Sequence, residues 1–162
     1  MKRVSVPAYD GEVSERGQIQ MTVEEVDAFL LEPHTLQVAS INPDGAPHLV
    51  AMYYAMIDGR ISFWTYGRSQ KVLNLQRDPR LTVMAEAGRA YSELRGVSVT
   101  GKAEISADPE VVASVGEALF PRYFGELDDR AREGVRHTAR KRVAVFVEPS
   151  RVVSWDHSKL GG

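Results

Sequence analysis

The segment from 96 to 105, GVSVTGKAEI, alternates small or apolar residues with polar ones without interruption. Successive side chains of a β-strand point to opposite faces, so this pattern predicts a strand with one buried face. Val97, Val99 and Ile105 fall on that face, and Lys102 and Glu104 fall on the other. The chain is therefore expected to contain a sheet that covers a core on one side.

Short strands with few helices account for most of the remaining sequence. Helices are predicted from a T-x-x-E capping box at Thr22, from Ser69, from an N-cap at Asp108 and from about Leu127. Strands are predicted over 35–41, 47–56, 61–66, 80–87, 143–147 and 152–155. The first three, joined by tight turns at 42–45 and 58–59, are expected to form a meander.

Six or seven antiparallel strands favour a closed or nearly closed barrel, because closure removes exposed sheet edges. Residues 1–20 lack apolar periodicity and are expected to form an extended N-terminal arm. Residues 21–162 contain no repeat or linker and are expected to form one domain. The predicted fold class is mainly β, antiparallel, with a few helices.

Composition removes several classes of function. Twenty Lys and Arg against 22 Asp and Glu give a formal charge of −2, which disfavours a nucleic-acid or anionic-membrane partner. The chain has no cysteine, so disulfide scaffolds and thiolate chemistry are excluded. No apolar run approaches the roughly 18 residues of a membrane span, and the N-terminus is too polar for a secretion signal. A soluble, cytoplasmic protein is expected.

The segment 63–71, FWTYGRSQK, carries the strongest local signal of a binding site. It is predicted to be a strand that turns through Gly67 and enters a helix beginning with Ser69 and Lys71. Unpaired N–H groups and the positive end of the helix dipole favour an anion there, and Arg68 can add a second charge. The alternative is that Ser69 is a plain N-cap and Lys71 a solvated lysine.

The strand from His48 to Tyr54 is apolar on both faces. Such a strand needs a cover on each side, which a barrel core and either a second subunit or a flat aromatic ligand would provide. The four histidines lack metal-site spacing, no metal is expected, and no G-x-S-x-G elbow is present. A phosphate cradle without a catalytic set of side chains suggests that a cofactor does the chemistry.

These segments together resemble the flavin- and deazaflavin-binding split β-barrel proteins typified by pyridoxamine 5′-phosphate oxidase. The motifs that carry the resemblance are NPDGAPHLVAMYY, F-x-T-x-x-x-S-x-K followed by NLQRDPR, RGVSVTGKAEI and the closing VVSWD. The resemblance implies a split β-barrel homodimer in which both subunits complete each site. It assigns the phosphate to Ser69 and Lys71 and the ring system to residues 50–54 with Trp64 and Thr65. The full set of expected cofactor-binding residues is Val50, Ala51, Met52, Tyr53, Tyr54, Trp64, Thr65, Arg68, Ser69, Lys71 and Trp155.

Departures from the oxidase pattern disfavour oxidation of pyridoxine phosphate as the function of this chain. Val50 and Gln70 stand where the oxidase has arginine, and only His157 and Lys159 follow Trp155. This chain, which is shorter than the oxidase, resembles the branch of the family that uses the deazaflavin coenzyme F420. The phospholactyl-glutamate tail of that coenzyme needs a cationic groove. The arginines expected to supply that groove are Arg60, Arg68 and Arg80.

The resulting expectation is an F420-dependent reductase that passes hydride to a small unsaturated or heteroaromatic substrate. The first alternative is an FMN-dependent oxidase or flavin reductase, and the second is a protein that binds a flavin, deazaflavin or tetrapyrrole without turnover. No side chain is assigned a catalytic role. Tyr53, Tyr54 and Tyr66 are the hydroxyls available near the ring.

Overall fold

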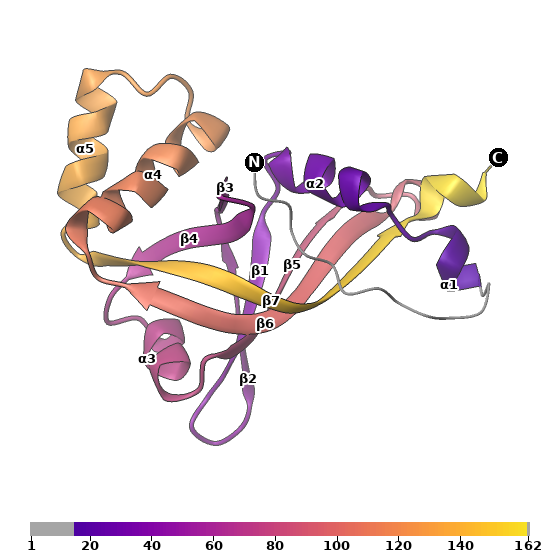
Figure 1. Cartoon of the computed structure of the whole chain (residues 1–162), viewed down its shortest axis with the longest axis horizontal. Coiled ribbons are helices and arrows are strands. Elements are labelled where there is room, and N and C mark those ends of the chain that lie inside the picture. The colour runs from indigo at the N-terminus through magenta and orange to yellow at the C-terminus, as the bar shows by residue number, and fades with distance from the viewer. Residues whose placement is uncertain (1–14, 162) are drawn as a thin grey trace.

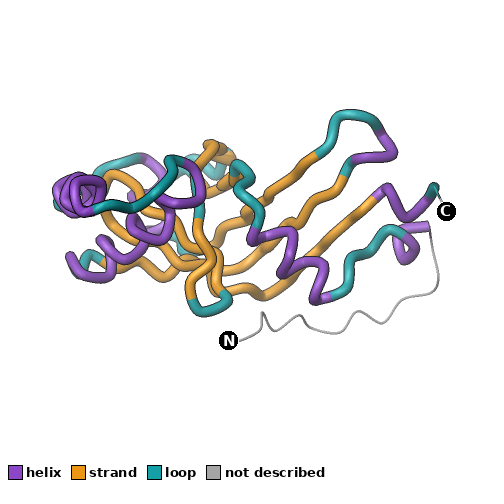
Figure 2. Tube along the Cα trace, turned by 90° about the horizontal axis from the view of Figure 1, so that it is seen from above, coloured by secondary structure: helices purple, strands orange, loops and turns teal. Residues whose placement is uncertain are grey.

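A computed structural model of the chain describes residues 15–161, and it is built round one antiparallel sheet with helices packed against it (Figures 1 and 2). The elements in chain order are α1 (Glu15–Gln18), α2 (Val23–Leu31), β1 (Leu36–Ile41), β2 (Pro47–Met52), β3 (Ala55–Ile57), β4 (Arg60–Tyr66), α3 (Gln70–Arg77), β5 (Arg80–Ala87), η1 (Tyr91–Glu93), β6 (Arg95–Ser106), α4 (Pro109–Tyr123), α5 (Asp129–Ala139), β7 (Arg142–Asp156) and η2 (His157–Leu160). No helix within residues 15–161 is both long and apolar enough to cross a membrane.

The path of the chain between β2 and β3 brings the two edges of the sheet together. Its strand order is β2-β1-β5-β6-β7-β4-β3, so β2 and β3 occupy opposite edges although only Tyr53 and Tyr54 separate them in sequence. Three peptide links can span at most about 11 Å, so the two edges must come together at this point. The seven strands therefore curl into the split-barrel form that the sequence predicted.

The predicted three-strand meander over residues 35–66 is wrong. The chain leaves the sheet at Tyr53 and Tyr54, and the β3–β4 hairpin joins β7 at the other edge. Tyr54 causes the break: its N–H donates to the Tyr123 hydroxyl at 3.4 Å instead of to a neighbouring strand. Its fully buried phenol donates to the carbonyl of Leu30 at 2.9 Å. Tertiary contacts here override the local alternation.

Two further expectations need correction at the ends of the chain. The strands predicted over 143–147 and 152–155 are one strand, β7, with a bulge opposite Thr100 and Gly101 in which Ser150 is the extra residue. Residues 15–18 of the expected extended arm form the short helix α1. Residues 1–14 of that arm lie outside the described residues.

Two cores lie on opposite faces of β4. Ile61 and Phe63 point into the barrel, where they join the larger core with α2, β1, β5 and β6. Trp64 packs against the second core, which is formed beneath α4 and α5 with Ala144 and Phe146 of β7. Because successive side chains of β4 point to opposite faces of the sheet, this one strand contributes to both cores. The helices α4 and α5 cover the outer face near one end of the sheet (Figure 1).

The bulge in β7 provides a test of the fold. A Cβ atom at Gly101 would lie 2.0 Å from the Glu148 carbonyl oxygen, whereas Gly134 in α5 has no atom within 4 Å of that position. Gly101→Ala should lower the free energy of unfolding by about 1–3 kcal/mol, the usual range for overpacking. Gly134→Ala should raise it by about 0.5–1 kcal/mol, because alanine favours helix. Chemical denaturation of both variants measures these changes, and equal stabilities would contradict the described bulge.

Candidate functional site

The junction between β4 and α3 is the predicted anion site. Ser69 is the N-cap residue of α3, but its side chain makes no capping hydrogen bond, and its hydroxyl oxygen is buried without a partner in residues 15–161. The interpretation of Ser69 as a plain N-cap is therefore wrong. A buried hydroxyl beside the free N–H groups of a helix start is an unused binding group, because buried polar atoms normally have partners.

Lys71, in the first turn of α3, lies half-buried at the same junction. Its ammonium group donates to Thr65 Oγ1 at 3.0 Å, and it forms no ion pair with any residue that the structure describes. Burial, and then the neighbouring Arg142 guanidinium, lowers the pKa of Lys71. The interpretation of Lys71 as a solvated lysine is also wrong. A desolvated cation without a counter-charge favours the binding of an anion.

Arg142 is a second half-buried cation near the junction, and sequence analysis missed it. It begins β7 in register with Tyr66, and its guanidinium lies 4.8 Å from the centre of the Trp64 ring. Burial lowers the pKa of Arg142. The only sequence signal was the basic run 140–142 ahead of a strand; its place beside β4 depends on a pairing of residues 76 positions apart.

The two cations contact opposite faces of β4. Lys71 contacts Thr65, which shares the inward parity of Phe63, whereas Arg142 contacts Trp64 on the face beneath α4. The predicted cofactor residues Thr65 and Trp64 therefore belong to two different places. We call the first the cradle: Thr65, Ser69 and Lys71.

The second place is a cavity of about 210 Å³ between β4, the β2–β3 break and the α4–α5 pair, here called the outer pocket. Apart from Arg142, its lining is apolar or aromatic. Three of the lining residues were expected to bind cofactor, namely Met52, Tyr53 and Trp64. The other lining residues come from helices that sequence analysis did not connect with the site: Gly116, Leu119, Phe120, Phe124 and Val135.

The remaining predicted residues of β2 divide between its faces. Val50 and Met52 pack against the barrel core, while Ala51 and Tyr53 are exposed. Tyr54 cannot contact a ring, because its own ring is 0% exposed and its hydroxyl is bonded to backbone carbonyls. Burial raises the pKa of Tyr54, which removes it as a proton donor.

Trp155 and Arg68 lie at opposite ends of the molecule. Trp155 is next to the last residue of β7, in register with Gly96, and this end of β7 lies away from α3 (Figure 1), so one subunit does not bring Trp155 to the cradle. Arg68 is exposed in the turn before Ser69, and makes no side-chain hydrogen bond or ion pair with residues 15–161.

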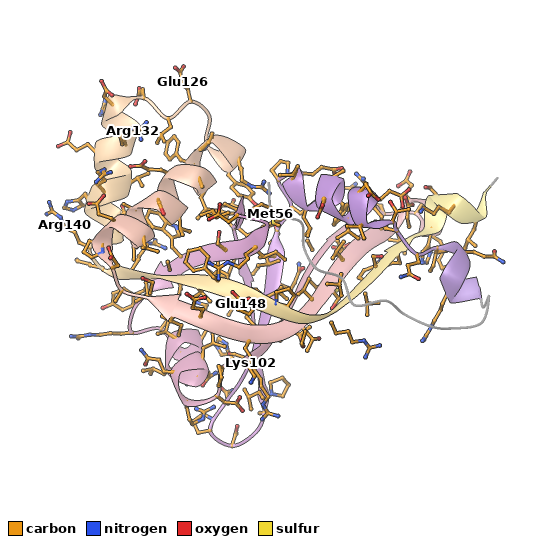
Figure 3. All side chains as sticks on the ribbon, in the orientation of Figure 1. Met56, Lys102, Glu126, Arg132, Arg140 and Glu148 are labelled. Carbon is orange, nitrogen blue, oxygen red and sulfur yellow. The ribbon has the colours of Figure 1, made fainter. Side chains whose placement is uncertain are left out.

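Two arginines of the expected cationic groove are already paired. Arg60 bonds to Glu104 and Glu148, and Glu148 lies midway along β7, well away from the labelled Arg140 at the base of α5 (Figure 3). Arg80 bonds to Asp78. Two other basic residues lie close to the junction: the Gly67 N–H donates to the Lys141 carbonyl at 3.0 Å, which places the backbone of the α5–β7 turn, with Arg140 and Lys141, beside it. Within residues 15–161 no three acidic or histidine side chains gather as a metal site would require.

Comparison with known proteins places this geometry in a family. The family model described as pyridoxamine 5′-phosphate oxidase matches residues 22–156. A conserved hypothetical protein from Mycobacterium tuberculosis, Rv2991, is 43% identical with a TM-score of 0.87, over 93% of this chain and 94% of that one. A structure described as an F420 reductase is 25% identical with a TM-score of 0.63, over 78% and 94%.

HutZ, described as a heme storage protein from Vibrio cholerae, shares the fold at 16% identity with a TM-score of 0.63, over 82% of this chain and 95% of that one. None of the curated proteins compared with the chain matches it. The family model covers most of the sequence, including strand β4 and helix α3 of the cradle. The chain therefore belongs to the pyridoxamine 5′-phosphate oxidase family.

Proposed function

We propose that the protein is a reductase that binds the deazaflavin coenzyme F420 and acts as a homodimer. The observation that carries this proposal is the cradle, in which an orphaned buried hydroxyl and a desolvated lysine meet a helix N-terminus. The likeness to an F420 reductase supports the choice among cofactors. FMN, which carries the same kind of phosphate, is the alternative.

The cradle fits the phosphate of such a cofactor. Ser69 would donate its hydroxyl, Lys71 would supply charge, and the first N–H groups of α3 would complete the set. Thr65 keeps the Lys71 ammonium in place through the 3.0 Å hydrogen bond. The exposed residues Ala51 and Tyr53 of the β2 segment are the ones available to the ring. When bound, the cofactor supplies the hydride, and the chain supplies orientation and apolar walls.

The second subunit would cover the outer face of β2. This strand is an edge strand, and Leu49 on it and Tyr53 just after it are 66% and 48% exposed. An exposed apolar edge favours association, which also removes a free sheet edge. Trp155 would then serve the cradle of the partner copy, because it is distant from its own.

Removing the Lys71 charge tests the cradle. Lys71→Met should weaken binding of F420 or FMN about 10- to 100-fold, as loss of a charge-assisted hydrogen bond does. Because the fold lowers the Lys71 pKa, the charged form opposes folding at neutral pH. The ligand-free variant should therefore unfold no earlier than the parent in thermal scans. Lys102→Met, an exposed change on β6, is the control; if both variants bind cofactor like the parent, the cradle is wrongly assigned.

The two cofactors differ in the anionic tail beyond the phosphate. Arg68, Arg140 and Lys141 lie around the junction without side-chain ion pairs among residues 15–161, so tail carboxylates would meet them. Arg68→Ala should weaken F420 binding by up to about fivefold, the range for exposed charges, and leave FMN binding nearly unchanged. F420 affinity should also fall more steeply with salt. Parallel titrations at two ionic strengths measure this, and tighter FMN binding without that salt difference would favour the FMN alternative.

The dimer is tested at the β2 edge. Light scattering at micromolar concentration should give the mass of two chains, with a total buried area of about 2,000 Å² or more expected for an obligate dimer. Leu49→Lys places a charge on the exposed apolar edge and should shift the protein toward monomer. Lys in place of the exposed Leu31 of α2 is the matched control. A parent protein that is monomeric under these conditions contradicts the proposal.

A further inference from the structure

The outer pocket has the size of a small ligand. Its volume of about 210 Å³ lies below the roughly 300–1,000 Å³ of pockets that bind drug-sized molecules. It therefore suits a compound with one substituted ring. Apart from Arg142, its walls are apolar or aromatic, so a ligand would be apolar over most of its surface.

Aromatic side chains define the shape of the outer pocket. Tyr53 stacks on Tyr123 with 4.1 Å between ring centres, and the rings of Phe124 and Tyr53 are nearly perpendicular with their centres 5.6 Å apart. The indole of Trp64 lies so close to α4 that a Cβ atom at Gly116 would be 2.4 Å from it. These rings form flat, fixed walls, which favour a planar ligand.

Arg142 sets the charge of the ligand. Its guanidinium covers one face of the Trp64 ring, and its N–H groups make no hydrogen bond or ion pair with other side chains of residues 15–161. The contact with the Trp64 ring offsets part of the cost of burying this cation, and a paired anion would offset more of it. The planar guanidinium matches a carboxylate through two parallel hydrogen bonds. Lys71 cannot take this role, because it contacts the opposite face of β4.

We propose that the outer pocket binds a small planar carboxylate, such as an aromatic or conjugated acid, with its carboxylate on Arg142 and its ring against Trp64. This site is distinct from the cradle and needs no cofactor to bind its ligand. The pocket would hold the compound on which the cofactor acts. Only this role as a substrate site rests on the proposed function.

Titration of the cofactor-free protein tests the site. Trans-cinnamate is the charged probe, and cinnamamide is its neutral counterpart of the same shape. Isothermal titration calorimetry should show cinnamate binding at least about tenfold more tightly than cinnamamide, as expected for a charge-assisted pair. Fluorescence of Trp64, isolated in a Trp155→Phe background, should change on cinnamate addition. Equal affinities for the two probes would overturn the proposal.

Variants on one strand separate charge from packing. Arg142→Met keeps a long apolar side chain over Trp64 and should abolish the preference for cinnamate, reducing its affinity about tenfold or more. Arg142→Lys should retain part of that preference because it keeps the charge. Arg151→Met removes an exposed charge elsewhere on β7 and should bind cinnamate like the parent. Circular dichroism and thermal scans confirm that each variant is folded.

Failure of this proposal and of the proposed function give different results. If Arg142→Met loses cofactor but binds cinnamate like the parent, Arg142 belongs to the cradle and the pocket proposal fails. If the parent binds cinnamate in an Arg142-dependent manner but binds neither F420 nor FMN, the pocket proposal stands and the proposed function fails. A change in Trp64 fluorescence that cinnamamide produces at the same concentrations as cinnamate would also overturn the pocket proposal.

Discussion

The burial of Tyr54 is the constraint on which the rest of the structure depends. Its phenol bonds to the carbonyls of Leu30 and Glu32 at the end of α2, and the Arg122 guanidinium lies 4.7 Å from its ring centre. Arg122 also donates to three carbonyls there, of Leu30, Leu31 and Glu32. One residue thus joins the end of α2, the end of α4 and the point where the sheet closes. These contacts of Tyr54 hold β2 and β3 apart as two separate strands.

Where the sheet closes, the two faces of β4 contribute to two different surfaces. The inward face of β4 ends at the cradle, and its outward face supplies the floor of the outer pocket. Each surface holds one half-buried cation, Lys71 or Arg142, whose charge is not balanced by a carboxylate within residues 15–161. Burial of such groups without a carboxylate is unfavourable, and the binding proposed for each surface would supply the missing counter-charge.

Local patterns were sufficient wherever the determining residues are close in sequence. The Thr22 capping box with Glu25, the bounds of β5 and the junction at Ser69 follow from neighbours within a few residues. The break at Tyr54 could not be predicted, because its partner Tyr123 is 69 residues away. Arg142 was missed for the same reason, since only strand register places it over Trp64. Arg60 was misjudged because its counter-charge Glu148 lies on a distant strand.

The unpaired charge of Lys71 also affects how much of the protein stays folded in a cell. An anion that binds only the folded chain adds stability according to its concentration relative to its Kd, by about 2.7 kcal/mol at a hundredfold excess. The ligand-free chain keeps a desolvated ammonium beside Arg142 and lacks that contribution. Its unfolded fraction, and with it proteolysis, would rise when the ligand is scarce. If the cradle binds its anion as proposed, the amount of this protein should follow the supply of that anion, even with synthesis held constant.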